Sequence, residues 1–276
     1  MPLYDVGPVV LVGAGQMGMA MAVGWLEAGL SPDQLILVDP SPSPAVRHKA
    51  SEISITTLAR PPVKPAQVLV LAVKPQVAPD VLLAARSCVD ENTLVISVMA
   101  GISIAQMSKA LGTDRVVRTI PNTPAKIGLG AIGAFAGTGV EYDDQVVVDN
   151  VLDASGRTFW VEKEDDINAV TGVSGSGPAY IFNMVEALAA AGEAQGLAPQ
   201  LAMELARKTV VGSAMLLEAE PNTAPATLRE NVTSPNGTTY AAMQILMGEE
   251  GLTDLMVRAV TAARKRSEEL GRDGSH

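Results

Sequence analysis

The segment "TSPNGTT" at residues 233–239 places small, uncharged and mostly hydroxylated side chains directly before an apolar run that looks helical. Ser, Thr and Asn are preferred at helix N-caps, so an ordinary capping loop is one interpretation. A cap needs only one or two such residues, however, and Ser234 to Thr239 supply six in succession. Because the first amides of a helix have no partner within the helix, these residues can instead form a neutral binding site for a carboxylate.

A second group of candidate residues is the glycine pattern "GAGQMG", which follows the apolar run "VVLV" and precedes residues with helical apolar spacing. Gly13 permits a tight turn, Gly15 lets the backbone approach a pyrophosphate, and Gly18 allows close packing of helix on strand. The amides of Gln16 and Met17 lie at the expected helix start, where the positive end of the dipole favours phosphate. We therefore predict a dinucleotide site, with a purely structural glycine turn as the alternative.

The residues after the second predicted strand give conflicting signals about the dinucleotide. Asp39 ends that strand, where an acid commonly binds the ribose 2′-hydroxyl of NAD. Ser41, Ser43, Arg47 and Lys49 follow closely, and hydroxyls with a cation can bind the 2′-phosphate of NADP. The two cations can equally be solvated helix residues. We expect NADPH as the cofactor, with NADH as an open alternative.

Two more predicted strands end in proline turns that should open toward the same crevice, because ligands bind at the carboxyl ends of strands in open α/β sheets. The candidate cofactor-binding residues there are Ala72, Val73, Lys74, Pro75, Asn122 and Pro124. Asn122 and Thr123 can position a nicotinamide, although Asn and Pro are also ordinary turn formers.

Histidine is scarce, and this scarcity limits the chemistry. The chain has only His48 and His276, whereas dehydrogenases with a histidine base and serine-type hydrolases need a histidine inside the site. "TGVSGSGPAY" (171–180) has the glycine spacing of the β-hydroxyacid dehydrogenases, but Tyr180 occupies the position of their catalytic lysine. Without that lysine, alcohol oxidation lacks its proton acceptor.

Composition excludes several other classes of function. A net charge of −10 argues against a nucleic-acid partner, because phosphate backbones are bound by basic patches. The single cysteine, Cys88, has no partner for a disulfide or metal cluster and is expected to be a small buried hydrophobe. No apolar run reaches the roughly 18 residues of a membrane span, and a signal peptide is not evident. We expect a cytoplasmic protein with neither a metal nor a membrane partner.

The elements that must position these residues follow from the apolar pattern. Strand, glycine turn, helix and second strand form a βαβ unit at the start of the chain. Further apolar runs alternate with helix-length segments, which predicts a largely parallel, doubly wound sheet in an α/β Rossmann domain. The predicted strands are residues 9–13, 34–39, 67–73, 93–99, 115–121, 131–136 and 157–162.

Strand signals end near residue 162, which divides the chain into a dinucleotide-binding domain at 1–162 and an all-helical domain at 163–276. The predicted helix at 178–195 is apolar on nearly every face and should be buried all round. Because about 110 residues offer little cover for such a helix, we expect a homodimer built on the helical domain. A central helix in a monomeric bundle is the alternative.

Several of these motifs together resemble the pyrroline-5-carboxylate reductase family. They are "VGAGQMG", "LAVKPQ", "ISVMAGIS", "RTIPNTP", "TGVSGSGPAYIF" and "ENVTSPNGTTYAAMQILMGEE". The resemblance implies reduction of Δ1-pyrroline-5-carboxylate to L-proline, the last step of proline biosynthesis, with NADPH or NADH. It also implies a Rossmann domain and an interlocked helical dimer, which is often assembled into decamers.

The same resemblance assigns roles to residues of the helical domain. It implies that the substrate carboxylate is bound by the segment from Ser234 to Thr239, including Asn236, Gly237 and Thr238. The Thr239 hydroxyl is then the catalytic group that approaches the ring nitrogen, and Ser176 lines the same pocket across the dimer interface. Two residues depart from the pattern: Asn236 stands where glycine is common, and Asp39 is not typical of members that prefer NADPH.

A cyclic imine suits a site without strong acids, because it is protonated easily near neutral pH and then needs mainly orientation. Two other functions stay open at this stage: a β-hydroxyacid dehydrogenase and a non-enzymatic NAD(P)-binding protein. Six-membered cyclic imino acids remain possible side substrates, since one methylene changes affinity by only about 1–3 kcal/mol.

Overall fold

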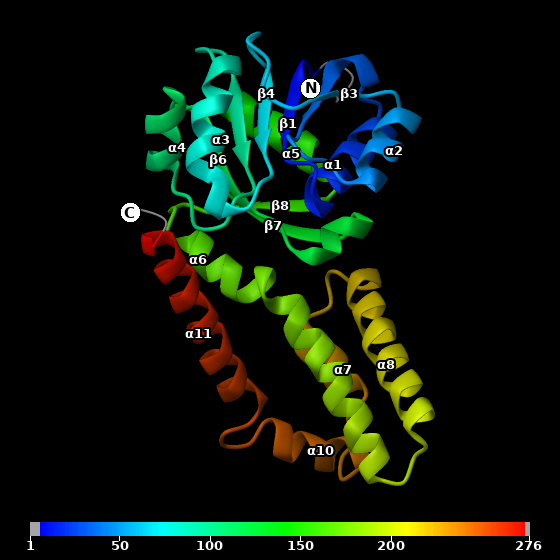
Figure 1. Ribbon diagram of the computed structural model, residues 1–276. Helices are drawn as coiled ribbons and strands as arrows, with labels where there is room; N and C mark the ends of the chain where they lie inside the picture. The colour runs from blue at the N-terminus through cyan, green and yellow to red at the C-terminus, as the bar shows by residue number, and fades with distance from the viewer. Residues whose placement is uncertain (1–5, 274–276) are drawn as a thin grey trace. The chain divides into compact units, whose positions relative to one another are not determined.

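The computed structural model describes residues 6–273 of the chain. In this part, eight strands form one sheet in the order β3-β2-β1-β4-β5-β6-β7-β8 (Figure 1). The strands are β1 (Val9–Val12), β2 (Leu35–Val38), β3 (Thr56–Leu58), β4 (Val68–Leu71), β5 (Leu94–Ser97), β6 (Val116–Ile120), β7 (Gly130–Ala136) and β8 (Gly156–Trp160).

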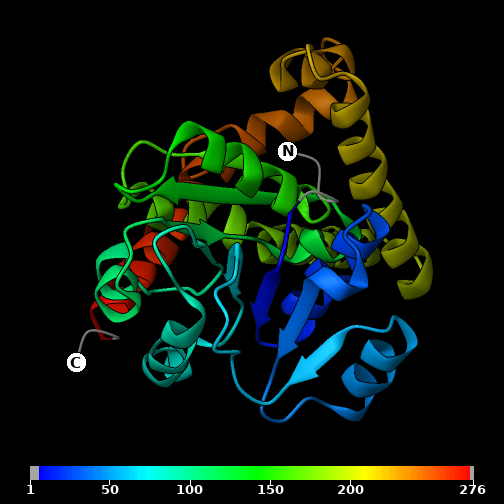
Figure 2. The same ribbon diagram turned by 90° about the horizontal axis from the view of Figure 1, so that it is seen from above.

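Helices cover both faces of this sheet (Figure 2). Alternate residues of β1 point to opposite faces, so Leu11 packs in one apolar core and Val10 in the other. The first core also contains residues of α1 (Gln16–Glu27), α2 (Pro44–Glu52) and α5 (Tyr142–Asp153), and the second contains residues of α3 (Ala78–Ala85) and α4 (Ile104–Leu111). This arrangement confirms the predicted doubly wound α/β fold.

Two features of the sheet were not predicted. β3 was missed because it is three residues long and its first two residues are exposed, so it lacks the apolar run of a buried strand. β7 pairs antiparallel with β6, while every other neighbouring pair is parallel. The chain between β6 and β7 holds only a short 3₁₀ segment at Thr123–Ile127, whereas a parallel neighbour needs a crossover connection of about a dozen or more residues.

The strand register aligns the carboxyl ends of β1, β2 and β4. Val12 is aligned with Val38 of β2 and with Leu71 of β4. The next amides continue the pairing: Gly13 donates to the Val38 carbonyl and Ala72 donates to the Val12 carbonyl, each at 2.8 Å. The crossovers turn in opposite directions on the two sides of β1, which creates the crevice where open α/β sheets bind ligands.

The chain divides into two compact units, one of residues up to Gly175 together with the chain from Ala263, and one of Ser176–Ala262. The predicted division at residue 162 falls just after β8. α6 (Asp166–Val170) belongs with the sheet, because its Ile167 is buried and its Val170 lies against Gly133 of β7. α11 (Leu252–Asp273) begins in the second unit, and its part from Ala263 belongs to the first unit, where Arg264 pairs with Asp165.

The second unit is helical throughout. It contains α7 (Gly177–Ala194), α8 (Pro199–Ala219), α9 (Pro225–Asn231), α10 (Thr238–Leu246) and the start of α11. α7 packs along α8 through small residues, with Ala189 buried on α7 and Ala202 and Ala206 buried on α8. Their large apolar side chains stay exposed in the single chain, including Phe182 at 63%.

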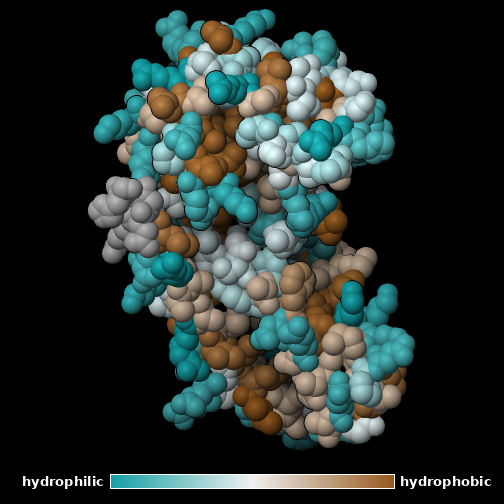
Figure 3. All heavy atoms as spheres, viewed as in Figure 1, coloured by the Kyte–Doolittle hydropathy of each residue, from teal (hydrophilic) through white to brown (hydrophobic). Residues whose placement is uncertain are grey.

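Apolar surface accordingly gathers over these helices (Figure 3). The alternative of a central helix in a monomeric bundle is wrong, because such a helix would be covered within its own chain.

Candidate functional site

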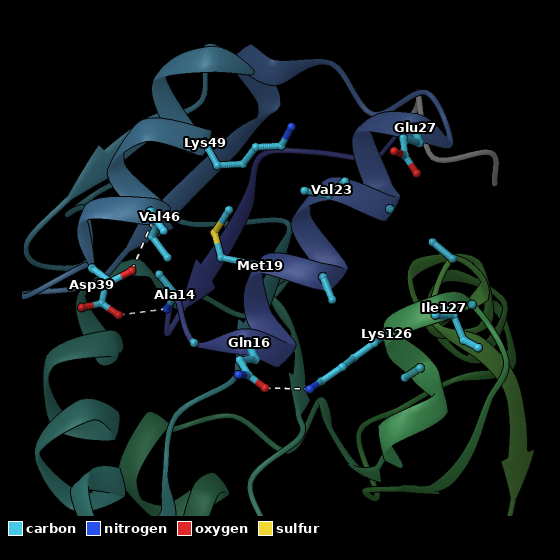
Figure 4. Close-up of a pocket in the computed structure, with 18 of the residues that line it drawn as sticks. Ala14, Gln16, Met19, Val23, Glu27, Asp39, Val46, Lys49, Lys126 and Ile127 are labelled. Carbon is cyan, nitrogen blue, oxygen red and sulfur yellow. Dashed lines mark hydrogen bonds between the residues drawn. The ribbon is translucent and has the colours of Figure 1, made fainter. Parts of the chain in front are cut away.

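A cleft of about 1050 Å³ lies beside the glycine turn of the first unit (Figure 4). It is lined by residues that follow β1, β2 and β6 and by one side of α1 and α2. The predicted cofactor-binding residues among them are Gly15, Gln16, Asp39 and Ser41. The lining also includes Ser43 and Lys49, which are candidates for binding a 2′-phosphate.

The three glycines of the turn differ in the space that a side chain would have. Gly13 has a φ of +107°, and a Cβ there would lie 2.5 Å from the Ala72 carbonyl oxygen. Gly18 lies so close to the Gly13 carbonyl that no side chain fits between helix and strand. Gly15 has an ordinary φ of −69°, and a Cβ there would meet nothing within 4 Å. Gly13 and Gly18 therefore serve the fold, whereas Gly15 keeps open a space into which a phosphate can move.

The start of α1 has the groups needed to bind an anion. Gly15 is the N-cap residue and provides no side-chain hydrogen bond to the first amides, and the first turn contains no acidic residue. Since the first amides of a helix lack intrahelical partners, they remain available together with the positive end of the dipole. The residues present therefore fit a dinucleotide whose pyrophosphate lies at this helix start.

Asp39 connects the ends of β1 and β2. One carboxylate oxygen accepts the Ala14 amide at 2.9 Å, and the other accepts the Ser41 amide at 2.8 Å. Asp39 is half-buried and still lines the cleft, so its negative charge is present where the ribose of a dinucleotide would lie.

The cations near Asp39 differ in their surroundings. Lys49 lines the cleft, and its ammonium lies 3.2 Å from the Glu52 carboxylate. Arg47 is exposed and is not part of the cleft lining. Much of the positive charge expected beside a 2′-phosphate is therefore either paired or directed to solvent.

The remaining predicted cofactor residues do not line this cleft. Ala72 and Val73 lie against the glycine turn at Gly13, and Lys74 and Pro75 begin a short 3₁₀ turn after β4. Met17, on the first turn of α1, packs against the core of the first unit. Their contacts with a cofactor stay predictions.

Asn122 is buried, and both ends of its amide have partners. Nδ2 donates to the Ser174 carbonyl at 3.1 Å, and Oδ1 accepts the Ala131 amide at 3.0 Å. The side chain therefore fixes the turn after β6, whose 3₁₀ segment (Thr123–Ile127) contains Pro124. A contact between Asn122 and the nicotinamide remains a prediction.

Lys126 is a cleft residue that the sequence analysis missed. It lies in the 3₁₀ segment after β6, and its Nζ donates to Gln16 Oε1 at 2.7 Å. Figure 4 shows the two side chains pointing toward one another at the start of α1. Extending the candidate strand end beyond Pro124 by two residues would have included this cation.

The hydroxyl-rich segment forms the loop and first turn of α10 in the second unit. Asn236 has a φ of +58°, a left-handed conformation that Asn tolerates better than most residues. Glycine also adopts this conformation readily, which agrees with the family resemblance, because that resemblance implies glycine at this position. Gly237 is the N-cap residue, and a Cβ there would collide with the Ser234 hydroxyl.

The amides at the start of α10 are not satisfied by a side-chain cap, although hydroxyl groups are abundant around them. Gly237 occupies the N-cap position of α10, so side-chain capping does not account for the hydroxyl groups of this segment. Thr238 and Thr239 are the first two residues of the helix, and Thr239 is half-buried. Ser176 lies in the same unit, at the N-cap of α7. Free amides with adjacent hydroxyls can bind a carboxylate without a cation.

Other kinds of site are not evident in the described residues. Within residues 6–273, no three His, Cys, Asp or Glu side chains are grouped so that they could hold a metal ion. No helix in the same range combines the length and apolarity needed to cross a membrane. Cys88 is fully buried, and burial raises the pKa of its thiol to about 11, so it behaves as a small hydrophobe as predicted.

Known proteins resemble both halves of the chain. Residues 164–270 match the family "Pyrroline-5-carboxylate reductase dimerisation", and residues 8–101 match "NADP oxidoreductase coenzyme F420-dependent". The chain is 36% identical over 270 residues to pyrroline-5-carboxylate reductase from Pisum sativum, covering 97% of each sequence.

Two solved structures extend the similarity. The pyrroline-5-carboxylate reductase of Coxiella burnetii is 33% identical, with a TM-score of 0.88 over 96% of this chain and 99% of the other. The pyrroline carboxylate reductase of Plasmodium falciparum, solved with NADP bound, is 26% identical, with a TM-score of 0.79 over 97% of this chain and 98% of the other.

Proposed function

Because this chain belongs to the pyrroline-5-carboxylate reductase family, we propose that it reduces the C=N bond of Δ1-pyrroline-5-carboxylate to give L-proline, with NADPH or NADH as the reductant. One observation carries the proposal: a dinucleotide turn on a Rossmann sheet occurs in one chain with an uncapped, hydroxyl-rich helix start. The first fits a nicotinamide dinucleotide, and the second fits the carboxylate of a small imino acid.

The residues of the chain act by binding and orientation. The free amides at the start of α10, with the Ser234 and Thr238 hydroxyls, hold the substrate carboxylate. The Thr239 hydroxyl is the catalytic group and holds the ring nitrogen by a hydrogen bond, while Asn236, Gly237 and Ser176 shape the same pocket. When bound, the nicotinamide supplies the hydride. The iminium already carries the proton on nitrogen, so the site needs no strong acid.

The cleft offers groups that favour each of the two cofactors. Ser41, Ser43 and Lys49 support binding of NADPH through its 2′-phosphate, which was the expectation from the sequence. Asp39 supports NADH, because its carboxylate repels a 2′-phosphate and accepts hydrogen bonds from a 2′-hydroxyl. We propose that the enzyme uses both and that Asp39 lowers its preference for NADPH.

The assembly proposed for the enzyme is a homodimer through the helical unit, with further association to a decamer. The exposed apolar side chains of α7 and the match to a dimerisation family at residues 164–270 support self-association. The single buried cysteine suits the reducing cytoplasm, which is the location we propose.

A steady-state assay tests the activity directly. The purified chain is mixed with Δ1-pyrroline-5-carboxylate and either NADH or NADPH, and the loss of reduced nucleotide is compared with the L-proline formed. Equal amounts of each are expected. Cofactor binding without turnover would instead identify a non-enzymatic NAD(P)-binding protein. In a separate assay with NAD⁺ or NADP⁺, oxidation of 3-hydroxy acids would identify a β-hydroxyacid dehydrogenase.

A further inference from the structure

Lys126 brings a positive charge to the glycine turn from a distant part of the chain. Its backbone lies in the 3₁₀ segment after β6, and its ammonium donates to Gln16, the first residue of α1, at 2.7 Å. Both residues line the cleft (Figure 4). Within residues 6–273, the ammonium of Lys126 has no carboxylate within ion-pair distance, although the whole chain carries ten more negative than positive charges.

This placement is unfavourable for the protein alone. A cation near a helix N-terminus opposes the helix dipole, and the first turn of α1 has no acidic residue to offset it. Holding a long side chain in one conformation also costs rotamer entropy. An anion at the helix start would reverse the electrostatic effect, because it would interact favourably with the ammonium and with the free amides at once.

We propose that Lys126 binds the pyrophosphate of the nicotinamide dinucleotide and that Gln16 holds its ammonium in position. The inference rests on the proposed function, since it assigns a further binding residue to the same cofactor. The pyrophosphate fits better than the 2′-phosphate, because Gln16 directly follows Gly15, whereas Asp39 and Ser41 mark the ribose end at β2. Lys126 should therefore contribute equally to NADH and NADPH.

Equilibrium binding tests this role without depending on turnover. Dissociation constants of wild type, Lys126→Met and Lys126→Arg are measured by fluorescence for NADH and NADPH, and by competition for ADP and adenosine. Lys64→Met is the matched control, because Lys64 is exposed and lies outside the cleft. Thermal unfolding of the two methionine variants checks that both fold equally well.

Lys126→Met should raise the dissociation constants of NADH, NADPH and ADP at least about tenfold, because it removes a charge-assisted hydrogen bond to the phosphates. Adenosine, which has no phosphate, should bind as before. Lys126→Arg should retain most of the affinity, and Lys64→Met should retain all of it. Gln16→Met should weaken ADP binding less, and it should add little to Lys126→Met because the two residues act together.

Three results would overturn the assignment. Unchanged ADP affinity in Lys126→Met would make the lysine an ordinary surface residue. A loss confined to NADPH would place its charge at the 2′-phosphate instead. If wild type binds none of NADH, NADPH and ADP, the dinucleotide site itself is wrong, and the proposed function falls together with the role of Lys126.

Discussion

At the scale of single residues, the proposed substrate site offers hydroxyls and amides where many dehydrogenases use a histidine or lysine. Thr239 is the second residue of α10, at a helix start that no side chain caps. A hydroxyl there can both donate and accept a hydrogen bond, which suits a ring nitrogen that is protonated in the substrate and becomes an amine in the product.

Substituting Thr239 tests whether this hydroxyl has more than a structural role. We expect Thr239→Ala to lower kcat about 100-fold, because misplacing a reacting group by about 1 Å can cost that much. The dissociation constant for NADH should stay within a factor of two. Thr239→Ser keeps the hydroxyl and should restore most of the rate. An unchanged kcat in Thr239→Ala would show that the hydroxyl does not contact the reacting ring.

Asp39 has two roles that substitutions can separate. Its carboxylate accepts hydrogen bonds from the Ala14 and Ser41 amides, and it also places a negative charge in the cleft. Replacing it by serine or asparagine removes the charge in both cases, while asparagine keeps one acceptor oxygen for the turn.

We expect Asp39→Ser to raise the ratio of kcat/KM for NADPH to that for NADH about tenfold, which corresponds to about 1.4 kcal/mol of lost repulsion. Asp39→Asn should change the ratio similarly, with a smaller loss of stability. Glu91→Gln removes an exposed acid outside the cleft and should leave the ratio unchanged. If Asp39→Ser does not change the ratio, Asp39 does not sense the 2′-phosphate.

At the scale of elements, the turn between β1 and α1 combines residues that serve the fold with residues that serve the ligand. Gly13 needs its positive φ and has no room for a side chain, because the end of β4 lies against it. Gly15 has neither restriction in the protein alone. We therefore expect the absence of a side chain at Gly15 to serve a ligand that approaches it from outside the chain.

This difference predicts opposite effects for two equivalent substitutions. Gly13→Ala should destabilise the protein by at least 1–3 kcal/mol, because it combines a strained φ with a clash at the Ala72 carbonyl. Gly15→Ala should cost less than about 1 kcal/mol, the usual range for an N-cap change, yet weaken NADH binding at least tenfold. Urea unfolding and NADH fluorescence measure the two effects separately. Tight NADH binding by Gly15→Ala would exclude a close approach of the pyrophosphate.

At the scale of the whole molecule, many large apolar side chains of the helical unit stay exposed to solvent in the single chain. Phe182 and Leu188 of α7 and Leu216 of α8 are exposed in the single chain. Burying a large apolar side chain contributes about 1.5–3 kcal/mol, so a second copy of the chain can stabilise these helices substantially.

Phe182→Glu should therefore shift the protein toward monomers, as measured by light scattering after size-exclusion chromatography. Charge on an apolar interface is unfavourable because the carboxylate loses its hydration without gaining a partner. Val63→Glu is the matched control, since Val63 is 86% exposed in the first unit. If the Phe182→Glu variant keeps the wild-type mass, α7 does not form the interface.

The sequence alone determined the features that depend on near neighbours. Strand, turn and helix at residues 9–27 follow from local apolar period and glycine spacing, and the helical second unit follows from composition. The resemblance to one family, carried by motifs along the whole chain, also needed no structure.

The tertiary structure decided the features that depend on long-range pairing. It placed Lys126 against Gln16, 110 residues away, and it joined the Asn122 amide to Ser174 and Ala131. It also gave β7 its antiparallel direction, and it showed that only Gly15 among the three motif glycines faces open space. A local pattern can predict which residues form a strand or a turn, but the partners of a side chain depend on how distant segments cross in the folded chain.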